Sequence, residues 1–232
     1  MKLAIMQPYY FPYLGYFQLM AAVDTFVILD DVQFIKGGWI HRNTILLEGK
    51  TKPILMPVEH MSQLRLINEH DRVLDSKQRH SQLRLIRHAY QHAPHFADVM
   101  PMVERIMKDE ERNVAAYLGR LLSEVRDYVG LDTSILYSSE LTNDKNAKCE
   151  HLVLSICEHL DADHYINAIG GTALYDKAMF AEAGVELDFI KMDPVTYRQF
   201  NEPFTPNLSI IDVLMFNSKP KVRELLNAYT LT

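Results

Sequence analysis

The chain has 232 residues, of which 48% are hydrophobic and 23% charged, and its formal net charge is −6 at neutral pH. This composition is typical of a globular protein with a substantial core, and the acidic balance argues against general nucleic-acid binding, which needs clustered basic charge. No apolar stretch approaches the roughly 18 to 20 residues that span a bilayer, and too few apolar residues precede Gln7 for a signal peptide. We therefore expect a soluble, cytoplasmic protein with no membrane insertion and no nucleic-acid partner.

The first quarter of the chain has the pattern of a strand, a helix, a strand and a hairpin. Leu3–Met6 is a short apolar run, Tyr16–Ala22 has helical character, and Thr25–Leu29 is a second apolar run rich in β-formers. A strand–helix–strand unit of this kind favours a right-handed parallel crossover. The runs 44–47 and 52–58, separated by a turn that contains glycine, predict a hairpin.

Residues 75–128 have a helical pattern. Apolar residues recur there at three- and four-residue spacing in three segments, which are divided near Ala93-Pro94 and again at Asp109–Arg112. Strand and helix patterns alternate again after this region. The expected elements are a strand at 134–137, a helix at 145–159, a strand at 164–166, a helix at 173–183, a strand at 186–190, and two helices that begin near Ser209 and Pro220.

This alternation at both ends of the chain predicts an α/β fold. We expect a mostly parallel, Rossmann-like sheet with flanking helices and a helical insertion around residues 75–128. No low-complexity linker divides the chain, so a single α/β domain over residues 1–232 is expected. In such sheets, ligands bind beyond the carboxyl ends of the strands, near the point where the strand order reverses. The polar clusters that follow the expected strands are Gln7, Asp30-Asp31, Ser138–Glu140, Asn167–Gly171 and Asp193. Their positions predict one cleft.

Three side chains are candidates for proton transfer. Asp30 or Asp31, at the end of a strand, would act as a general base while the other aspartate caps the loop or pairs with a basic side chain. The alternative is that the pair only makes a turn and a cap. His41 titrates near neutrality beside Arg42, although it would also fit a half-exposed strand residue. Two carboxylates without a third ligand at a diagnostic spacing predict no metal site.

Other polar and aromatic residues of the same segments are candidates for substrate binding. Lys36 and Arg42 carry charges suited to a phosphate or carboxylate, and Trp39 offers a ring for stacking. The Gly170-Gly171 turn permits close backbone approach to such an anion at the start of a helix. Core packing is the alternative explanation for the dense aromatic residues of the first loop. The expected substrate-binding residues are Gln7, Tyr9, Tyr10, Tyr13, Gln33, Lys36, Trp39, Arg42, Asn43, Gly170, Gly171, Asn207 and Ser209.

The only two cysteines, Cys149 and Cys157, lie eight residues apart in an expected helix, too far along it to form a disulfide. Neither belongs to a CxxC motif, so both are expected to be buried thiols. No serine or cysteine lies in a nucleophile-elbow sequence, and neither a P-loop nor a complete GxGxxG is present in the sequence.

Four segments carry a resemblance to a known family. They are residues 6–17, 30–43, 170–175 and 204–217, with the sequences MQPYYFPYLGYF, DDVQFIKGGWIHRN, GGTALY and FTPNLSIIDVLMFN. With these motifs the chain resembles the WbqC-like family of bacterial proteins. The resemblance implies a role in the synthesis of O-antigen or other surface polysaccharides. Some similar proteins are described as glycine transferases, which implies modification of an amino sugar. Where the family pattern often has asparagine, this chain has His41, which shifts the expected catalytic role toward the two aspartates.

Together these features favour a cytoplasmic enzyme of surface-glycan biosynthesis. It would transfer an acyl or aminoacyl group, such as glycyl, to the amine of a nucleotide-linked amino sugar. Its partner would be a nucleotide-sugar or another small phosphorylated substrate, while the sequence identifies no cofactor and leaves a homo-oligomer open. The alternative is a non-catalytic binding or assembly module of the same pathway, because no motif identifies a reaction.

Overall fold

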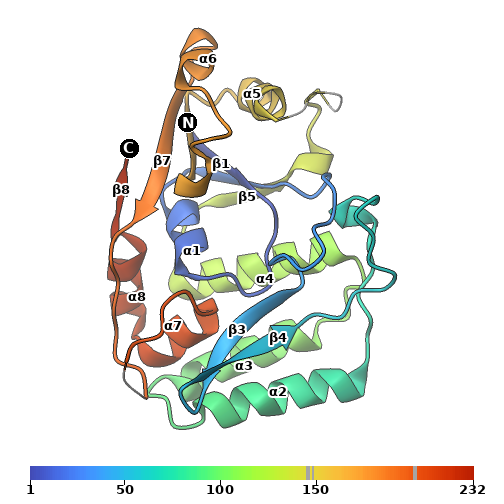
Figure 1. Ribbon diagram of the computed structural model, residues 1–232, viewed down its shortest axis with the longest axis vertical. Helices are drawn as coiled ribbons and strands as arrows, with labels where there is room; N and C mark the ends of the chain where they lie inside the picture. The colour runs from blue at the N-terminus through green and yellow to red at the C-terminus, as the bar shows by residue number, and fades with distance from the viewer. Residues whose placement is uncertain (145–146, 148, 201–202) are drawn as a thin grey trace.

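The computed structural model of the protein describes residues 1–144, 147, 149–200 and 203–232 (Figure 1). Its main sheet has six strands in the order β5-β2-β1-β6-β7-β8. The first five in this order are parallel, and β8 runs antiparallel to β7 at one edge. The strands are β1 (Lys2–Met6), β2 (Thr25–Ile28), β5 (Ser134–Tyr137), β6 (His164–Ala168), β7 (Glu186–Met192) and β8 (Tyr229–Leu231). The prediction of an α/β fold with a mostly parallel sheet is confirmed.

The strand β1 lies in the middle of this sheet, where the strand order reverses. It pairs with β2 over Leu3–Met6 on one side and with β6 on the other. Leu3, Ala4 and Ile5 are buried, because helices cover both faces of a parallel sheet. From β1 the chain continues outward through β2 and β5 and then crosses back to β6. The switch point of the sheet therefore lies between β1 and β6.

Helices cover both faces of the main sheet (Figure 1). The α-helices are α1 (Leu14–Ala21), α2 (Ser76–Tyr90), α3 (Phe96–Lys108), α4 (Val114–Val129), α5 (Glu150–His159), α6 (Lys177–Glu182), α7 (Ile210–Phe216) and α8 (Lys219–Leu226), and the 3-10 turns are η1 (Ile67–Glu69), η2 (Ser138–Glu140) and η3 (Ile169–Gly171). The helices α5 and α6 pack on one face, and α1, α4 and α8 pack on the other. The helices α2, α3 and α4 lie in the region where three helical segments are predicted, and α4 also packs on the main sheet. Within the described ranges, no helix has the length and apolar character to cross a membrane.

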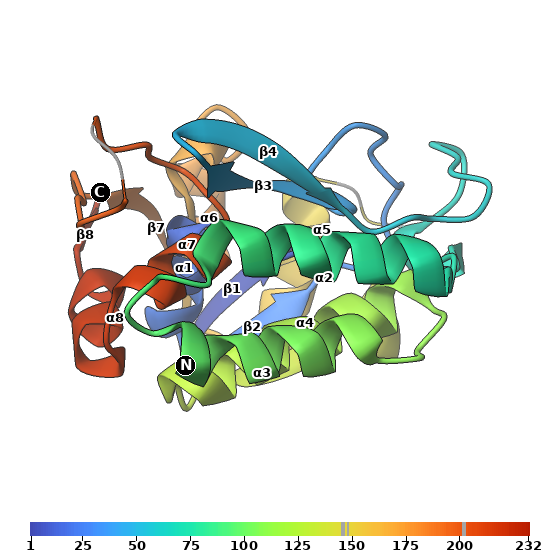
Figure 2. The same cartoon turned by 90° about the horizontal axis from the view of Figure 1, so that it is seen from below.

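The strands β3 (Arg42–Leu47) and β4 (Lys50–Leu55) form a separate antiparallel hairpin, as predicted. Glu48 and Gly49 turn the chain with φ of 50° and 74°, the left-handed backbone that a two-residue type I′ turn requires. The hairpin lies over α2 and apart from the main sheet (Figure 2). Its side chains Ile45 and Ile54 join the core on the same side of the sheet as α1 and α4.

Three elements differ from the sequence expectations. The helix α5 begins at Glu150, and the expected start at Lys145 lies outside the described residues. The helix α6 is shorter at its start than expected, because Asp176 caps it and the turn η3 comes first. The strand β8 was not predicted, since three residues are too few to show the two-residue alternation of a strand.

Candidate functional site

An open pocket lies at the carboxyl ends of β1 and β2, beside the switch point of the sheet, and we call it the switch-point pocket. Gln7 follows β1 directly, and Asp31 and Gln33 come from the loop after β2. Its volume is about 610 Å³, which falls in the range of about 300–1,000 Å³ that is typical of small-molecule sites. It is lined by Gln7, Asp31, Val32, Gln33, Ile35, Leu66, Ala147, Cys149 and Leu152.

Asp31 provides a carboxylate to the wall of this pocket. The side chain is half-buried, and the hydroxyl of Ser138 donates a hydrogen bond to its Oδ1. Ser138 is itself buried at the end of β5, so its position is fixed by the sheet. A carboxylate that is oriented by a buried hydroxyl and lines a ligand pocket can accept a proton from a bound amine or hydroxyl.

Asp30 has a different environment, because its carboxylate is buried and engaged by neighbouring donors. Its Oδ1 accepts a hydrogen bond from the Ser139 amide at 3.0 Å. The same Oδ1 lies 3.0 Å from the Ser138 oxygen, whose single hydroxyl proton it shares with Asp31 Oδ1. Its Oδ2 accepts from the Ser139 hydroxyl at 2.7 Å and from the Asn68 side chain at 3.4 Å. Asp30 thus ties the loop after β2 to the loop after β5. These contacts favour the capping role for Asp30 and leave Asp31 as the candidate base.

The loop between β2 and β3 carries Lys36 and Trp39, and Arg42 follows it directly as the first residue of β3. Lys36 and Arg42 are exposed, and 48% of the Trp39 surface is accessible. They are not among the residues that line the switch-point pocket, but Gln33 and Ile35 of the same loop are. The cationic and indole groups therefore lie on, or directly after, a loop that borders the pocket and could meet the outer part of a long ligand.

His41 lies outside the switch-point pocket with a half-buried imidazole. Its ring packs against that of Phe34, with centroids 5.6 Å apart, and in the described part of the chain its buried Nδ1 has no hydrogen-bond partner. Burial lowers the pKa of His41, and the neighbouring charge of Arg42 lowers it further. A neutral imidazole packed on an aromatic ring fits the alternative of a half-exposed residue before a strand.

We expect His41→Gln to reduce the loss of stability that acid causes. Because the folded-state pKa of His41 is lowered, the unfolded chain takes up the proton first as the pH falls below about 6.5. The protein therefore loses stability as the pH falls from about 6.5 through the lower pKa that His41 has in the folded state. Solvent reaches the ring, so the effect should be less than ~1 kcal/mol. Urea unfolding at about pH 7.5 and about pH 5 measures it. The control is His92→Gln, which changes an exposed histidine. If the wild type, His41→Gln and His92→Gln all lost the same free energy of unfolding between the two pH values, the expectation would be contradicted.

The three tyrosines of the first loop occupy packed positions. Tyr10 is buried with its ring 4.9 Å from that of Phe11, and burial raises the pKa of its phenol well above the usual value. Tyr9 is half-buried against Tyr16, with ring centroids 5.5 Å apart. Tyr13 is half-buried and lines a separate cavity of about 30 Å³. Packing, the alternative explanation for these aromatic residues, accounts for their positions.

Asn43 and Ser209 hold this loop in shape. The buried Asn43 side chain donates hydrogen bonds to the carbonyls of Tyr10 at 3.2 Å and Phe11 at 2.8 Å. The hydroxyl of Ser209 donates to the same Phe11 carbonyl at 2.9 Å. Phe11 has a φ of 42°, a left-handed conformation that a bulky residue keeps only when its surroundings hold it. These two polar side chains therefore bind the backbone of the loop.

The remaining expected residues, Asn207, Gly170 and Gly171, are not among the residues that line the switch-point pocket. Asn207 is exposed with a φ of 58° and lines the same small cavity as Tyr13. Gly170 is exposed, whereas Gly171 is buried, and a Cβ at Gly171 would lie 3.0 Å from Nδ2 of Asn167. The glycine pair belongs to η3 after β6, and α6 begins further along the chain. The expectation that this turn stands at the start of a helix is wrong.

Cys149 is a pocket residue that the sequence did not reveal. It is exposed at the N-cap of α5, whereas Cys157 is buried. The expectation of two buried thiols is therefore wrong for Cys149. A helix that follows a parallel strand begins at the carboxyl edge of the sheet, where ligands bind. If the start of α5 had been predicted at Glu150, the sequence would have placed Cys149 at the pocket.

The two cysteines allow a direct test of this geometry. Iodoacetamide should modify Cys149 in the folded protein and spare Cys157, because burial shields the second thiol and raises its pKa to about 12. Intact-mass spectrometry would then show a single added group, and peptide mapping would locate it. A ligand in the switch-point pocket should slow the reaction, and Cys149→Ser should take up no label. Reaction of both thiols at one rate would be inconsistent with this structure.

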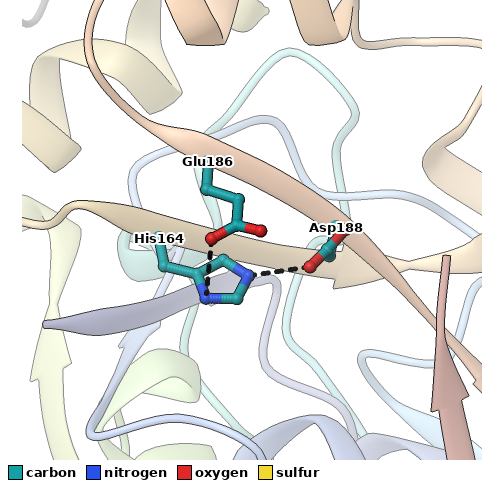
Figure 3. A group of neighbouring side chains, drawn as sticks. All are labelled: His164, Glu186 and Asp188. Carbon is teal, nitrogen blue, oxygen red and sulfur yellow. Dashed lines mark hydrogen bonds and ion pairs between the residues drawn. The ribbon is translucent and has the colours of Figure 1, made fainter.

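A second group of titratable side chains lies at the amino ends of β6 and β7 (Figure 3). His164 Nε2 is 3.0 Å from Asp188 Oδ2, and His164 Nδ1 is 3.8 Å from Glu186 Oε2. Lys177 Nζ lies 3.3 Å from the other oxygen of Asp188. One imidazole and two carboxylates are ligand types that hold metal ions. Figure 3 shows that the two ring nitrogens are directed at different carboxylates, which fits an ion-pair cluster better than a metal centre.

Comparisons with known proteins give the family. The chain matches the WbqC-like protein family over residues 7–224, a range that includes both loops of the switch-point pocket. It is 29% identical over 220 residues to the uncharacterized protein Rv1507c of Mycobacterium tuberculosis (strain ATCC 25618 / H37Rv), and the match covers 93% of each chain. No solved structure matches it. The chain belongs to the WbqC-like protein family.

Proposed function

We propose that this protein is a cytoplasmic enzyme of surface-glycan biosynthesis that transfers an acyl or aminoacyl group to the amine of a nucleotide-linked amino sugar. The observation that carries the proposal is the position of Asp31, whose carboxylate lines the switch-point pocket beside Gln7. The family resemblance supports the choice of substrate class. The pocket volume of about 610 Å³ is sufficient for the sugar and the reacting group.

In the proposed reaction, the amine nitrogen of the sugar attacks the carbonyl carbon of an activated acyl donor, an ester or thioester. A C–N bond forms, the bond from the carbonyl carbon to the donor's oxygen or sulfur breaks, and the leaving group departs with the electron pair. Asp31 takes the proton that the nitrogen loses. Ser138 orients the Asp31 carboxylate through its hydrogen bond and so acts as a positioning residue.

The loop between β2 and β3 would hold the nucleotide part of the substrate. Lys36 is an exposed cation on this loop, and Arg42 is an exposed cation directly after it, at the start of β3. A guanidinium can bind a phosphate through two parallel hydrogen bonds. The accessible ring of Trp39 would stack on the base or the sugar. Because these charges are exposed, substrate affinity should fall as the salt concentration rises.

A non-catalytic binding or assembly module of the same pathway is the second proposal. It is favoured by apolar side chains on the loops that border the pocket. Ile35 and Trp39 are each 48% exposed, and Leu64 is 90% exposed. Exposed aromatic and aliphatic side chains are found on surfaces that bind another protein. In this proposal the pocket would bind a glycan precursor without converting it.

Mass spectrometry of the sugar nucleotides in a deletion strain tests the transferase proposal. A precursor that lacks one small acyl or aminoacyl group should accumulate, and the wild-type gene should remove it. The purified protein, given that precursor and the activated donor, should form the amide. If no precursor accumulates and the pure protein binds sugar nucleotides without product, the transferase proposal is excluded and the binding module is supported.

A further inference from the structure

A cationic pocket lies between β4 and the start of α2. Its volume is about 40 Å³, and its charged and amide side chains are Arg72, Arg79, Asp75, Gln78 and Gln82, so the two guanidiniums outnumber the one carboxylate. It shares no lining residue with the switch-point pocket. An inference about this pocket is therefore independent of the proposed function.

Arg72 places a positive charge inside the protein at this pocket. Its side chain is buried, its guanidinium lies 3.4 Å from the ring centroid of Tyr117, and Nη2 donates to the carbonyl of Asp109 at 2.9 Å. The carboxylate of Asp109 is engaged by Arg120, with the closest atoms 3.2 Å apart. Among the described residues, the buried Nη1 of Arg72 has no hydrogen-bond partner. A buried donor on a charged group is costly unless an acceptor reaches it.

Arg79 brings a second guanidinium to the same pocket. It is partly buried near the start of α2, and within the described ranges it makes no ion pair. Burial lowers the pKa of Arg72; Tyr117, Tyr10 and Asp109 oppose this shift, and the charge of Arg79 adds a smaller lowering effect. Two cations beside one cavity repel each other unless an anion lies between them.

Two glutamines and the carboxylate of Asp75 complete the polar lining of the pocket. Gln82 Oε1 accepts a hydrogen bond from the Leu55 amide at 3.2 Å, which leaves its side-chain nitrogen as a donor. The first amides of α2 are already used, because Asp75 accepts from Lys77 at 2.8 Å and from Gln78 at 3.3 Å. The pocket therefore relies on guanidinium and amide side chains rather than on the helix end.

We propose that this pocket binds a phosphoryl group between Arg72 and Arg79. A cavity that holds one water molecule has a volume of about 10–15 Å³ by the same measure. The volume of about 40 Å³ therefore has room for one tetrahedral oxyanion. The planar guanidiniums of Arg72 and Arg79 line this cavity and offer several N–H donors to the oxygens of a phosphate. The phosphoryl group comes either from inorganic phosphate or from a phosphorylated small molecule that leaves its organic part in solvent.

Isothermal titration calorimetry with inorganic phosphate tests this site. The wild type should show saturable binding with a dissociation constant below about 1 mM. Arg79→Gln should weaken it at least about tenfold, because a charge-assisted hydrogen bond is lost. The control is Arg84→Gln, which changes an exposed arginine of the same helix outside the pocket and should bind as the wild type does. The phosphate-free melting temperature of Arg79→Gln should equal that of the wild type, which separates binding from folding.

A nucleoside monophosphate in place of phosphate identifies the source of the group. Tighter binding that also depends on Arg79 would support a phosphorylated small molecule, and equal affinity would support the free ion. The absence of saturable binding to either probe, or equal affinities in the wild type and Arg79→Gln, would overturn the proposal, since water would then fill the pocket.

Discussion

Asp31→Asn is expected to lower the rate of amide formation by about 10²–10⁴-fold, the usual contribution of a general base. Asparagine keeps the size of the side chain and can still accept the hydrogen bond from Ser138, but it cannot take the proton of the attacking amine. The fold should be unaffected. The measurement is kcat for the purified protein, with the melting temperature recorded beside it.

Asp30→Asn is the matched control for this substitution. The Asp30 carboxylate holds Ser138, Ser139 and Asn68, so its loss should lower the free energy of unfolding by ~1–3 kcal/mol. The turnover of the folded fraction should fall much less than in Asp31→Asn, because Asp30 acts on Asp31 through Ser138 and does not itself take the proton. If Asp30→Asn abolished turnover at normal stability while Asp31→Asn retained it, the roles of the two aspartates would have to be exchanged.

Asp212→Ala is expected to give the largest loss of stability, ~3–5 kcal/mol. Asp212 is fully buried in α7, where its carboxylate accepts hydrogen bonds from the Tyr90 hydroxyl at 2.8 Å, the Tyr197 hydroxyl at 2.7 Å and the Gln199 amide at 2.8 Å. Alanine would leave three buried donors without an acceptor. Urea unfolding at neutral pH measures the loss, and Asp127→Ala, at an exposed position, should change stability little.

Asp212→Asn separates the charge of this group from its hydrogen bonds. Burial raises the pKa of Asp212 above the unfolded value of about 3.9, although the three donors oppose the shift. The folded protein therefore binds this proton more readily than the unfolded chain does. The stability from that preference is present below the unfolded pKa and is lost as the pH rises through the folded pKa. Asp212→Asn should lack this loss, and an identical pH profile in both proteins would show that Asp212 does not titrate with folding.

The parallel sheet was predictable because its central strands are mostly apolar. Leu3 to Ile5 and Thr25 to Ile28 are buried, so burial acts on consecutive residues and the pattern is visible in the sequence. The carboxyl-edge rule then placed Gln7 and Asp31 near each other, and both line the switch-point pocket.

The roles of individual polar side chains were harder to predict. Asn43 and Ser209 bind carbonyls of the aromatic loop, and a buried amide or hydroxyl has the same appearance in a sequence whether it binds backbone or ligand. Their hydrogen-bond partners depend on the left-handed backbone at Phe11, and no local sequence pattern predicts that conformation for a phenylalanine. Arg72 also escaped notice, because its burial follows from the packing of α4 against η1.

The bend at Phe11 also sets an order of events during synthesis. The hydrogen bond from Ser209 to Phe11 joins positions 198 residues apart in the chain. A ribosome releases the aromatic loop long before it releases α7, so the loop must wait for its anchor while β1 and β2 are already able to pair. The final shape of this loop should consequently be one of the last features that a nascent chain gains. A fragment that stops before Ser209 should keep strand pairing and lack the shaped loop.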